Sequence, residues 1–411
     1  MDRKMIEKYA ELIVKTGINL QENKILIITA LVENYEFVEI LTEIAYREGA
    51  REVIPHWIDE KMDRYKYTYA PDDLFDELPE YRKMFFLENV RKGACYIRLT
   101  GEDPDALKGI DQDKIMRYKR VLGEGVKEYR ERLMSHKNIW CVASAPTKAW
   151  AKKMFPDVSV EEAIEKLWEA ILKTNRMDEA DPLAALETHK RNLKKRTKFM
   201  NDNGFKSLRY TNELGTDLTL ELPESHIWLG GSDETEGVEY MANLPTEEIF
   251  TLPKKDGVNG VVYSTKPLVY NGVLIDEFWI RFEAGKAVEY DAKKGLEALK
   301  SLIDLDEGSC YLGEVALVPY HSPISEMDIL FYNTLFDENA SCHLALGEAY
   351  PVCIKDGEKM SKDELAKNGV NSSLAHEDFM VGSADMKIVG IRESGEEVAV
   401  FEAGDFAFEK K

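Results

Sequence analysis

The sequence is poor in cysteine and lacks any long hydrophobic run, and both shortages exclude classes of protein. Its five cysteines are widely spaced and contain no C-x-x-C pair, which argues against a disulfide framework or a zinc ribbon. They are Cys95, Cys141, Cys310, Cys342 and Cys353. The longest nearly apolar run is Ile25 to Val32, far shorter than the roughly 20 residues that span a bilayer. We therefore expect a cytoplasmic protein with reduced cysteines and no membrane contact.

Positive charge is also in deficit. The chain has 54 Lys and Arg against 76 Asp and Glu, a formal net charge of −22. Such a surface would repel phosphate backbones and anionic lipids, so we expect no nucleic-acid partner. The composition, with 44% hydrophobic and 32% charged residues, is that of an ordinary globular protein. At roughly 150 residues per domain, 411 residues predict two to three domains.

Motifs that would indicate a nucleotide site or a common hydrolase are missing. The turn after the first apolar run reads Leu31-Val-Glu-Asn-Tyr-Glu36, without the glycine-rich loop that cradles a phosphate. No G-x-S-x-G nucleophile elbow occurs, and the adjacent Cys342 and His343 would point to opposite faces of a strand. The segment His376-Glu-Asp-Phe-Met380 has Met where a helical H-E-x-x-H zinc site needs its second His.

The first half of the chain alternates short apolar strands with amphipathic helices. The predicted strands are 25–30, 52–57, 94–99 and 139–143, and the predicted helices include 112–135, 160–176 and 182–200. Continuous apolar strands between helices predict a parallel sheet that is covered on both faces. We predict a doubly wound α/β domain over residues 1–190, in which the isolated His56, His136 and His189 have structural roles.

Beyond about residue 206, the pattern changes to short strands separated by Gly, Pro, Asn and Asp. The predicted strands include 208–211, 217–222, 260–265 and 278–282, and a helix is predicted near 293–302. This pattern is typical of a mainly antiparallel sheet. We predict a β-rich α+β domain over residues 191–411.

Six candidate metal ligands follow residue 240. They are Glu248, Glu314, Glu338, His343, His376 and Asp378. His376 and Asp378 are two residues apart, so an extended chain directs both to one face. Glu314 interrupts an apolar strand pattern, where a buried carboxylate needs a partner such as a cation. Glu338 and His343 would be about 140° apart around a helix, so they can share an ion only on a strand or loop.

The charges of these six side chains match a pair of ions. Four carboxylates and two neutral imidazoles carry −4, which two divalent cations would neutralise. Hard oxygen ligands together with imidazole suit Zn, Co or Mn rather than copper or an iron–sulfur cluster. A dinuclear hydrolytic centre is therefore predicted. The alternative for each glutamate, in so acidic a chain, is an ordinary solvent-exposed position without a metal.

Four segments of the second half resemble a known enzyme family. They are Asn243-Leu-Pro-Thr-Glu-Glu-Ile-Phe-Thr251, Leu312-Gly-Glu-Val-Ala-Leu-Val318, Asp337-Glu-Asn-Ala-Ser-Cys-His-Leu-Ala-Leu-Gly-Glu-Ala-Tyr350 and His376-Glu-Asp-Phe-Met-Val-Gly-Ser383. In this order they are similar to the metallo-aminopeptidases that include aminopeptidases T, S and II of thermophilic and Gram-positive bacteria. The resemblance runs the whole chain. It implies a homodimeric two-metal exopeptidase that removes N-terminal residues from peptides.

The resemblance also implies roles for particular residues. The family's metal ligands fall on the six side chains given above, with Glu248 preferred to Glu247, and its catalytic tyrosine falls on Tyr350. We hypothesise that Glu314 bridges the ions and accepts the proton of the attacking water. Tyr350 would then donate a hydrogen bond to the oxyanion.

Two other functions are compatible with the sequence. A metal-stabilised binding protein would capture short peptides without cutting them, and a site closed by protein ligands would favour it. A metal-free oligomeric scaffold would require the six candidate residues to be scattered over the surface.

Overall fold

The computed structural model describes residues 3–410, which form two compact units. The first unit comprises the described residues up to Leu186 together with Ser232–Pro245, and the second comprises Glu187–Gly231 and the described residues from Thr246 onwards. The predicted mixed α/β class, with a parallel sheet and antiparallel sheets, is confirmed. The predicted domain division between residues 190 and 191 stays a prediction.

The first unit is built on a four-stranded parallel sheet. Its strands are β1 (Ile25–Leu31), β2 (Glu52–Ile58), β3 (Cys95–Thr100) and β4 (Trp140–Ser144). They lie in the order β2-β1-β3-β4. The chain leaves β1 for β2 on one side and then returns to the other side of β1 for β3. The strand order therefore reverses between β1 and β3.

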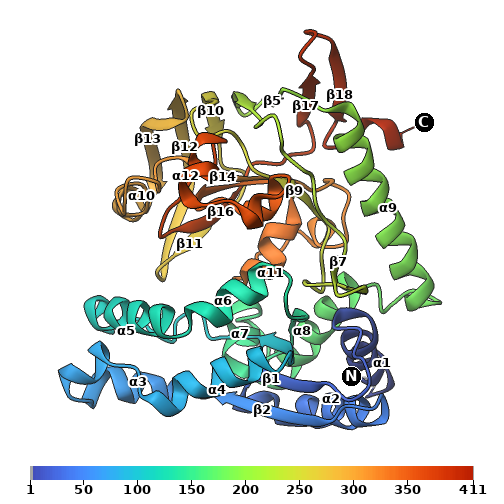
Figure 1. The fold of residues 1–411 in the computed structure, drawn as a ribbon, viewed down its shortest axis with the longest axis vertical. Helices are drawn as coiled ribbons and strands as arrows, with labels where there is room; N and C mark the ends of the chain where they lie inside the picture. The colour runs from blue at the N-terminus through green and yellow to red at the C-terminus, as the bar shows by residue number, and fades with distance from the viewer. Residues whose placement is uncertain (1–2, 411) are drawn as a thin grey trace. The chain divides into compact units, whose positions relative to one another are not determined.

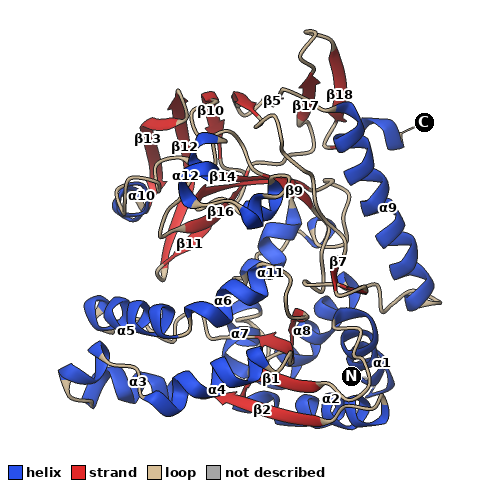
Figure 2. Cartoon of the chain, in the orientation of Figure 1, coloured by secondary structure: helices blue, strands red, loops and turns tan. Residues whose placement is uncertain are grey.

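The first unit also contains the helices α1 (Arg3–Leu12), α2 (Tyr35–Arg47), α3 (Glu60–Tyr69), α4 (Glu80–Arg91), α5 (Gln112–Gly125), α6 (Lys127–Met134), α7 (Lys148–Met154) and α8 (Val160–Thr174). Of these, α3 and α5 extend away from the sheet in Figures 1 and 2. The helical stretch predicted over 112–135 is confirmed, but the chain breaks at Val126 into α5 and α6. Gly123 and Gly125 precede the break, and glycine is the residue that weakens a helix interior most after proline. The unit also contains the short hairpin β7 (Asp233–Thr235) and β8 (Val238–Tyr240).

The second unit begins within α9 (Pro182–Asn203) and is rich in antiparallel strands. Its larger sheet has the order β11-β12-β10-β6-β5-β17-β18-β19, with β13 paired to β12. The strands are β5 (Ser207–Thr211), β6 (Asp217–Glu221), β10 (Val258–Tyr263), β11 (Leu268–Tyr270), β12 (Val273–Glu283), β13 (Lys286–Lys294), β17 (Lys387–Ile391), β18 (Glu397–Glu402) and β19 (Asp405–Phe406). The predicted β-rich character of this half is confirmed.

The helix predicted near 293–302 begins later than expected. Residues up to Lys294 pair with β12 as part of β13, and Gly295 then adopts φ = 75°, which turns the chain into α10 (Leu296–Ile303). A positive φ of this kind favours glycine. Two shorter helices, α11 (Thr334–Asp337) and α12 (Lys362–Lys367), complete the unit.

A second antiparallel sheet of this unit has the order β16-β15-β14-β9. Its strands are β9 (Ile249–Thr251), β14 (Leu312–Leu317), β15 (His343–Gly347) and β16 (His376–Met380). One face carries Val315, Leu344 and Phe379, which pack into the same core as the apolar side chains of the larger sheet. The opposite face is therefore left for other side chains.

All five cysteines are free and buried, as predicted for a chain without disulfides. Between residues 3 and 410, we find no helix with the length and apolar character needed to cross a membrane.

Candidate metal centre

The strand register gathers four of the six candidate ligands on the face opposite the core. Glu314 on β14 is opposite Ala345 on β15, which is opposite Asp378 on β16. Residues that are opposite one another in an antiparallel sheet point to the same side. His343 is two residues from Ala345 on β15, and His376 is two residues from Asp378 on β16, so both histidine side chains point to this face.

Glu248 reaches the same face just before β9. Phe250 of β9 is opposite Ala316 of β14, and Glu248 is two residues before Phe250. On the two central strands, β14 and β15, the other residues of this face are small: Ala316, Ala345 and Gly347. Their size leaves space above the sheet for the longer side chains to converge.

A β-bulge at Gly313 directs Glu314 to this face. Leu312 is opposite Leu346 on the core side, and without an irregularity Glu314 would point to the core as well. The register shifts between Leu312 and Glu314. The extra residue of the bulge interrupts the alternation of side chains, so Glu314 points to the face opposite that of Leu312. A Cβ at Gly313 would lie 2.2 Å from the carbonyl oxygen of Glu348, so only glycine fits there.

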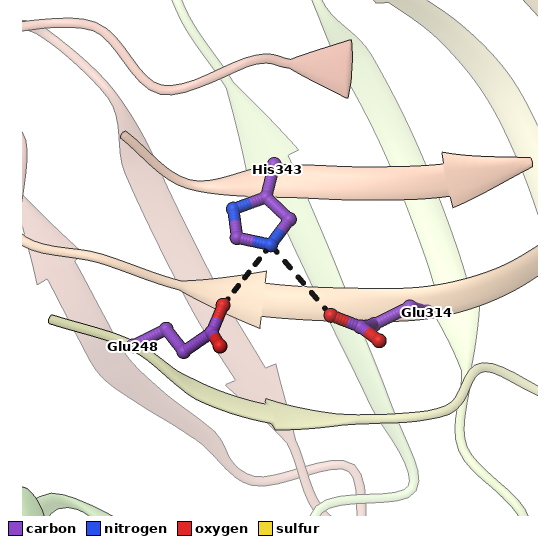
Figure 3. A group of neighbouring side chains, drawn as sticks. All are labelled: Glu248, Glu314 and His343. Atoms are coloured by element: carbon purple, nitrogen blue, oxygen red, sulfur yellow. Dashed lines mark ion pairs between the residues drawn. The ribbon is translucent and has the colours of Figure 1, made fainter. Parts of the chain in front are cut away.

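The ligand atoms form two clusters that share Glu314. In the first, His343 Nε2 lies 3.2 Å from Glu248 Oε2 and 3.6 Å from Glu314 Oε1 (Figure 3). In the second, His376 Nε2 lies 3.6 Å from Glu314 Oε2 and 3.8 Å from Asp378 Oδ1. Within each cluster, one donor atom from each residue lies within 4.8 Å of the others, a separation that suits a shared ion.

Backbone carbonyls orient both imidazoles. His343 Nδ1 lies 3.1 Å from the carbonyl oxygen of Ser341, and His376 Nδ1 lies 2.7 Å from that of Glu348. A carbonyl oxygen only accepts, so each Nδ1 carries the proton. In the neutral imidazole, the Nε2 lone pair then faces carboxylate oxygens, an arrangement that requires a cation or an added proton between them.

Electrostatics within the sheet indicate the same need for positive charge. Burial alone would lower the pKa of His343, but Glu248 and Glu314 raise it well above its ordinary value. Burial raises the pKa of Glu314, an effect that His343 opposes and Asp378 adds to. Burial, together with Glu248 and Asp378, raises the pKa of Glu338 well above its ordinary value. The site therefore attracts protons wherever no other cation is available.

Divalent cations fit these residues. Glu248 Oε2 and Asp378 Oδ1 are buried atoms that accept no hydrogen bond from the part of the chain that the structure describes. Buried carboxylate oxygens without such a donor are rare in proteins unless another partner is present. The donor set of carboxylate oxygen and imidazole nitrogen is one that Zn, Co and Mn accept.

Glu338 and Tyr350 adjoin the two clusters without belonging to either. The Glu338 carboxylate, at the start of a 3₁₀ turn (Glu338–Ala340), interacts electrostatically with the ligands of both clusters. The Tyr350 ring lies 4.6 Å from the His376 ring, centroid to centroid. Burial raises the pKa of Tyr350, and Glu314 and Asp378 raise it further, so its hydroxyl stays protonated and can donate a hydrogen bond.

Sequence reasoning missed two buried residues that position the site. Asn339 is 0% exposed; its Oδ1 accepts a hydrogen bond from the Glu247 N–H at 2.7 Å, and its Nδ2 donates to the Leu335 carbonyl at 2.9 Å. It therefore joins the segments that carry Glu248 and Glu338. His189, which we interpreted as isolated, instead has Nε2 2.7 Å from the carbonyl oxygen of Thr246 and 3.6 Å from Glu247 Oε2.

A buried cluster of carboxylates and imidazoles on one face of an antiparallel sheet is the donor set of a metal-dependent protein. The family model described as thermophilic metalloprotease (M29) matches residues 2–406, and the chain belongs to this family. The family expected from the sequence is thereby confirmed, and the chain is a metal-dependent peptidase.

Curated relatives match over almost the whole chain. Aminopeptidase AmpS of Bacillus subtilis is 46% identical, covering 98% of both chains. Aminopeptidase 2 of Geobacillus stearothermophilus is 44% identical, covering 99% of this chain and 98% of its own. Aminopeptidase T of Thermus thermophilus is 38% identical, covering 98% of both.

Two solved structures are similar to this chain. Wild-type AmpT from Thermus thermophilus superposes with a TM-score of 0.93 at 37% identity, covering 98% of this chain and 99% of its own. A dihydroxypyridine dioxygenase from Pseudomonas putida has a TM-score of 0.51 at 13% identity, covering 98% of this chain and 96% of its own, and shares the fold alone.

Proposed function

We propose that this chain is a two-metal aminopeptidase that hydrolyses the first peptide bond of short peptides with broad side-chain specificity. The observation that carries the proposal is the pair of ligand clusters that share Glu314. The names of the curated relatives, all aminopeptidases, support the choice of reaction. We further propose that it acts in the cytoplasm, as a homodimer.

In this proposal, Glu248, Glu314, Glu338, His343, His376 and Asp378 hold two divalent cations, which we expect to be Zn, Co or Mn. Such ions lower the pKa of a water molecule and polarise a peptide carbonyl. Glu314 contributes one oxygen to each cluster, which suits a bridging carboxylate. Because its carboxylate belongs to both clusters, we assign to Glu314 the proton of the attacking water.

Tyr350 is assigned to the oxyanion of the tetrahedral intermediate. We expect Tyr350→Phe to fold normally and to lower kcat about 100- to 1000-fold, because one such donor contributes roughly 3–4 kcal/mol to the transition state. KM should change little, since the oxyanion is absent from the bound substrate. Steady-state kinetics on aminoacyl-nitroanilides would test this. The matched control is Tyr320→Phe, at an exposed tyrosine of the same unit, and unchanged kcat in Tyr350→Phe would refute the role.

The proposed confinement to the first peptide bond depends on the substrate's free α-amine, which a metal or a carboxylate of this acidic site can bind. We expect Leu-Gly-Gly to release leucine, and N-acetyl-Leu-Gly-Gly to be cleaved about 10- to 100-fold more slowly, as loss of a buried charged hydrogen bond predicts. Product analysis by mass spectrometry distinguishes the two peptides. Equal rates on both would contradict exopeptidase action.

The alternative function is a peptide-binding protein with the same metals. It would bind Leu-Gly-Gly without producing leucine after prolonged incubation. Membership of a metalloprotease family and the position of the Tyr350 ring against His376 favour the enzyme.

A further inference from the structure

The first unit contains a cavity of about 630 Å³ at the carboxyl ends of its parallel strands. Each of the four strands contributes the segment that follows it. Val32 and Glu33 follow β1, Asp59 and Glu60 follow β2, Asp103 to Lys108 lie beyond β3, and Thr147 to Ala149 lie beyond β4. In open parallel sheets, ligands bind outside the carboxyl ends where the strand order reverses, and this sheet reverses between β1 and β3.

The size and lining suit a small organic molecule. Binding sites for such molecules occupy about 300–1,000 Å³ and combine apolar walls with a few polar groups. Leu31, Ile58 and Ala149 supply apolar surface here. The cavity lies wholly on residues of the first unit, so it is a different place from the metal centre.

The lining carries both signs of charge. Glu60 is half-buried, and both of its carboxylate oxygens accept from the Asp103 N–H, at 3.2 and 3.1 Å. Burial raises the pKa of Glu60 to about 7; the Asp103 hydrogen bond opposes this shift, and the carboxylates of Glu102, Asp103 and Glu33 add to it. A cationic group beside Glu60 would relieve that repulsion.

Three lysines line the same cavity. Lys61, Lys108 and Lys148 are exposed, Lys108 interacts electrostatically with Asp105, and the backbone N–H of Lys148 donates to Glu33 Oε2 at 3.2 Å. In a chain with a net charge of −22, three exposed lysine side chains around one cavity would attract an incoming anion. Arg64 adds rigidity, because its Nη1 donates to the carbonyls of Ala106 and Lys108 at 2.8 and 2.9 Å.

Two other kinds of ligand fit less well. Among the described residues, the donor groupings compact enough for a metal ion are those of the metal centre, and neither includes Glu33, Glu60 or Asp103. A nucleotide would need a glycine-rich phosphate loop, which the turn after β1 lacks, and its phosphates would face the carboxylates of the lining. A ligand with one positively charged group and one negatively charged group fits both the acidic side chains and the lysines of the lining.

We propose that this cavity binds a small zwitterion, a free α-amino acid or a short peptide. Its ammonium group would lie near Glu60, its carboxylate near Lys148 and the other lysines, and its side chain against the apolar wall. This second site goes beyond the peptidase function and does not depend on it.

The test is calorimetric titration of the full-length protein with L-leucine, with N-acetyl-L-leucine and with L-leucinamide, which lack the positive and the negative end respectively. We expect L-leucine to bind both the metal-loaded wild type and His343→Ala, the second with its metal centre disrupted. Both blocked compounds should bind about 10- to 100-fold more weakly, as loss of a charge-assisted hydrogen bond predicts. Leu-Gly-Gly on His343→Ala then distinguishes a free amino acid from a peptide as the preferred ligand.

Variants of the cavity complete the test. Glu60→Gln, which keeps an acceptor for the Asp103 N–H, and Lys148→Met should each weaken L-leucine binding to His343→Ala by a similar factor. Glu124→Gln and Lys119→Met, at exposed positions of α5 outside the lining, are the matched controls and should bind as before. Lys148 is exposed, so its variant tests the proposal even if Glu60→Gln unfolds. The proposal is overturned if His343→Ala does not bind L-leucine, if the cavity variants bind normally, or if the blocked compounds bind equally well.

Discussion

Replacing Glu314 by Gln is expected to lower kcat by about 100- to 10,000-fold, the range typical of a lost general base. The amide keeps the size of the carboxylate but can neither accept the proton nor contribute a full negative charge to both clusters. Glu314 is 6% exposed on a sheet whose other face is well packed, so the variant should keep its fold. Kinetics and circular dichroism would measure both properties.

The control for this variant is Glu377→Gln. Glu377 is between His376 and Asp378 on β16, but it is opposite Leu346 on the other side of the sheet. The substitution therefore changes the same chemical group one residue from two ligands without touching the clusters. We expect Glu377→Gln to retain nearly full activity, and full activity in Glu314→Gln would remove Glu314 from the mechanism.

Replacing His343 by Ala is expected to remove metal from the first cluster and activity with it. The imidazole is 1% exposed and is the nitrogen donor between Glu248 and Glu314, so its loss leaves two carboxylates with no neutral ligand. Loss of a residue that only hydrogen-bonds a metal ligand typically weakens metal affinity about 10- to 100-fold. Loss of the ligand itself should weaken the affinity for that ion at least as much. Metal content after dialysis, measured by mass spectrometry, should fall by about one ion per chain.

The matched control is His321→Ala. His321 is exposed in the same unit, and its Nδ1 lies 2.6 Å from Asp405 Oδ2, so it too pairs with a carboxylate. Its loss should leave metal content unchanged. A His343→Ala protein that retains its full metal content would show that the cluster is not a ligand set.

The strand positions of several candidate ligands were predictable from the two-residue period of a strand. The two-residue spacing of His376 and Asp378 placed them on one face, and the apolar pattern around Glu314 placed it in a strand, as the structure has it. Glu338 and His343 could share an ion only if they did not lie on one helix. The structure meets this condition, because the 3₁₀ turn that begins at Glu338 ends at Ala340 and His343 begins β15.

Features that depend on irregular backbone or on distant partners could not be predicted. The bulge at Gly313 reverses the face of Glu314, and a regular alternation would have placed its carboxylate in the core. The roles of Asn339 and His189 depend on contacts with residues 92 and 57 positions away in the chain. The same holds for α10, whose start is set by the pairing of β13 with β12.

The most direct test of the two-metal account is a titration of metal-stripped protein with Zn, Co or Mn, with bound ions per chain and aminopeptidase rate measured on the same samples. The account predicts that activity is absent without metal and reaches its maximum only as the second ion binds. Full activity in stripped protein, or a maximum at one ion per chain, would contradict it.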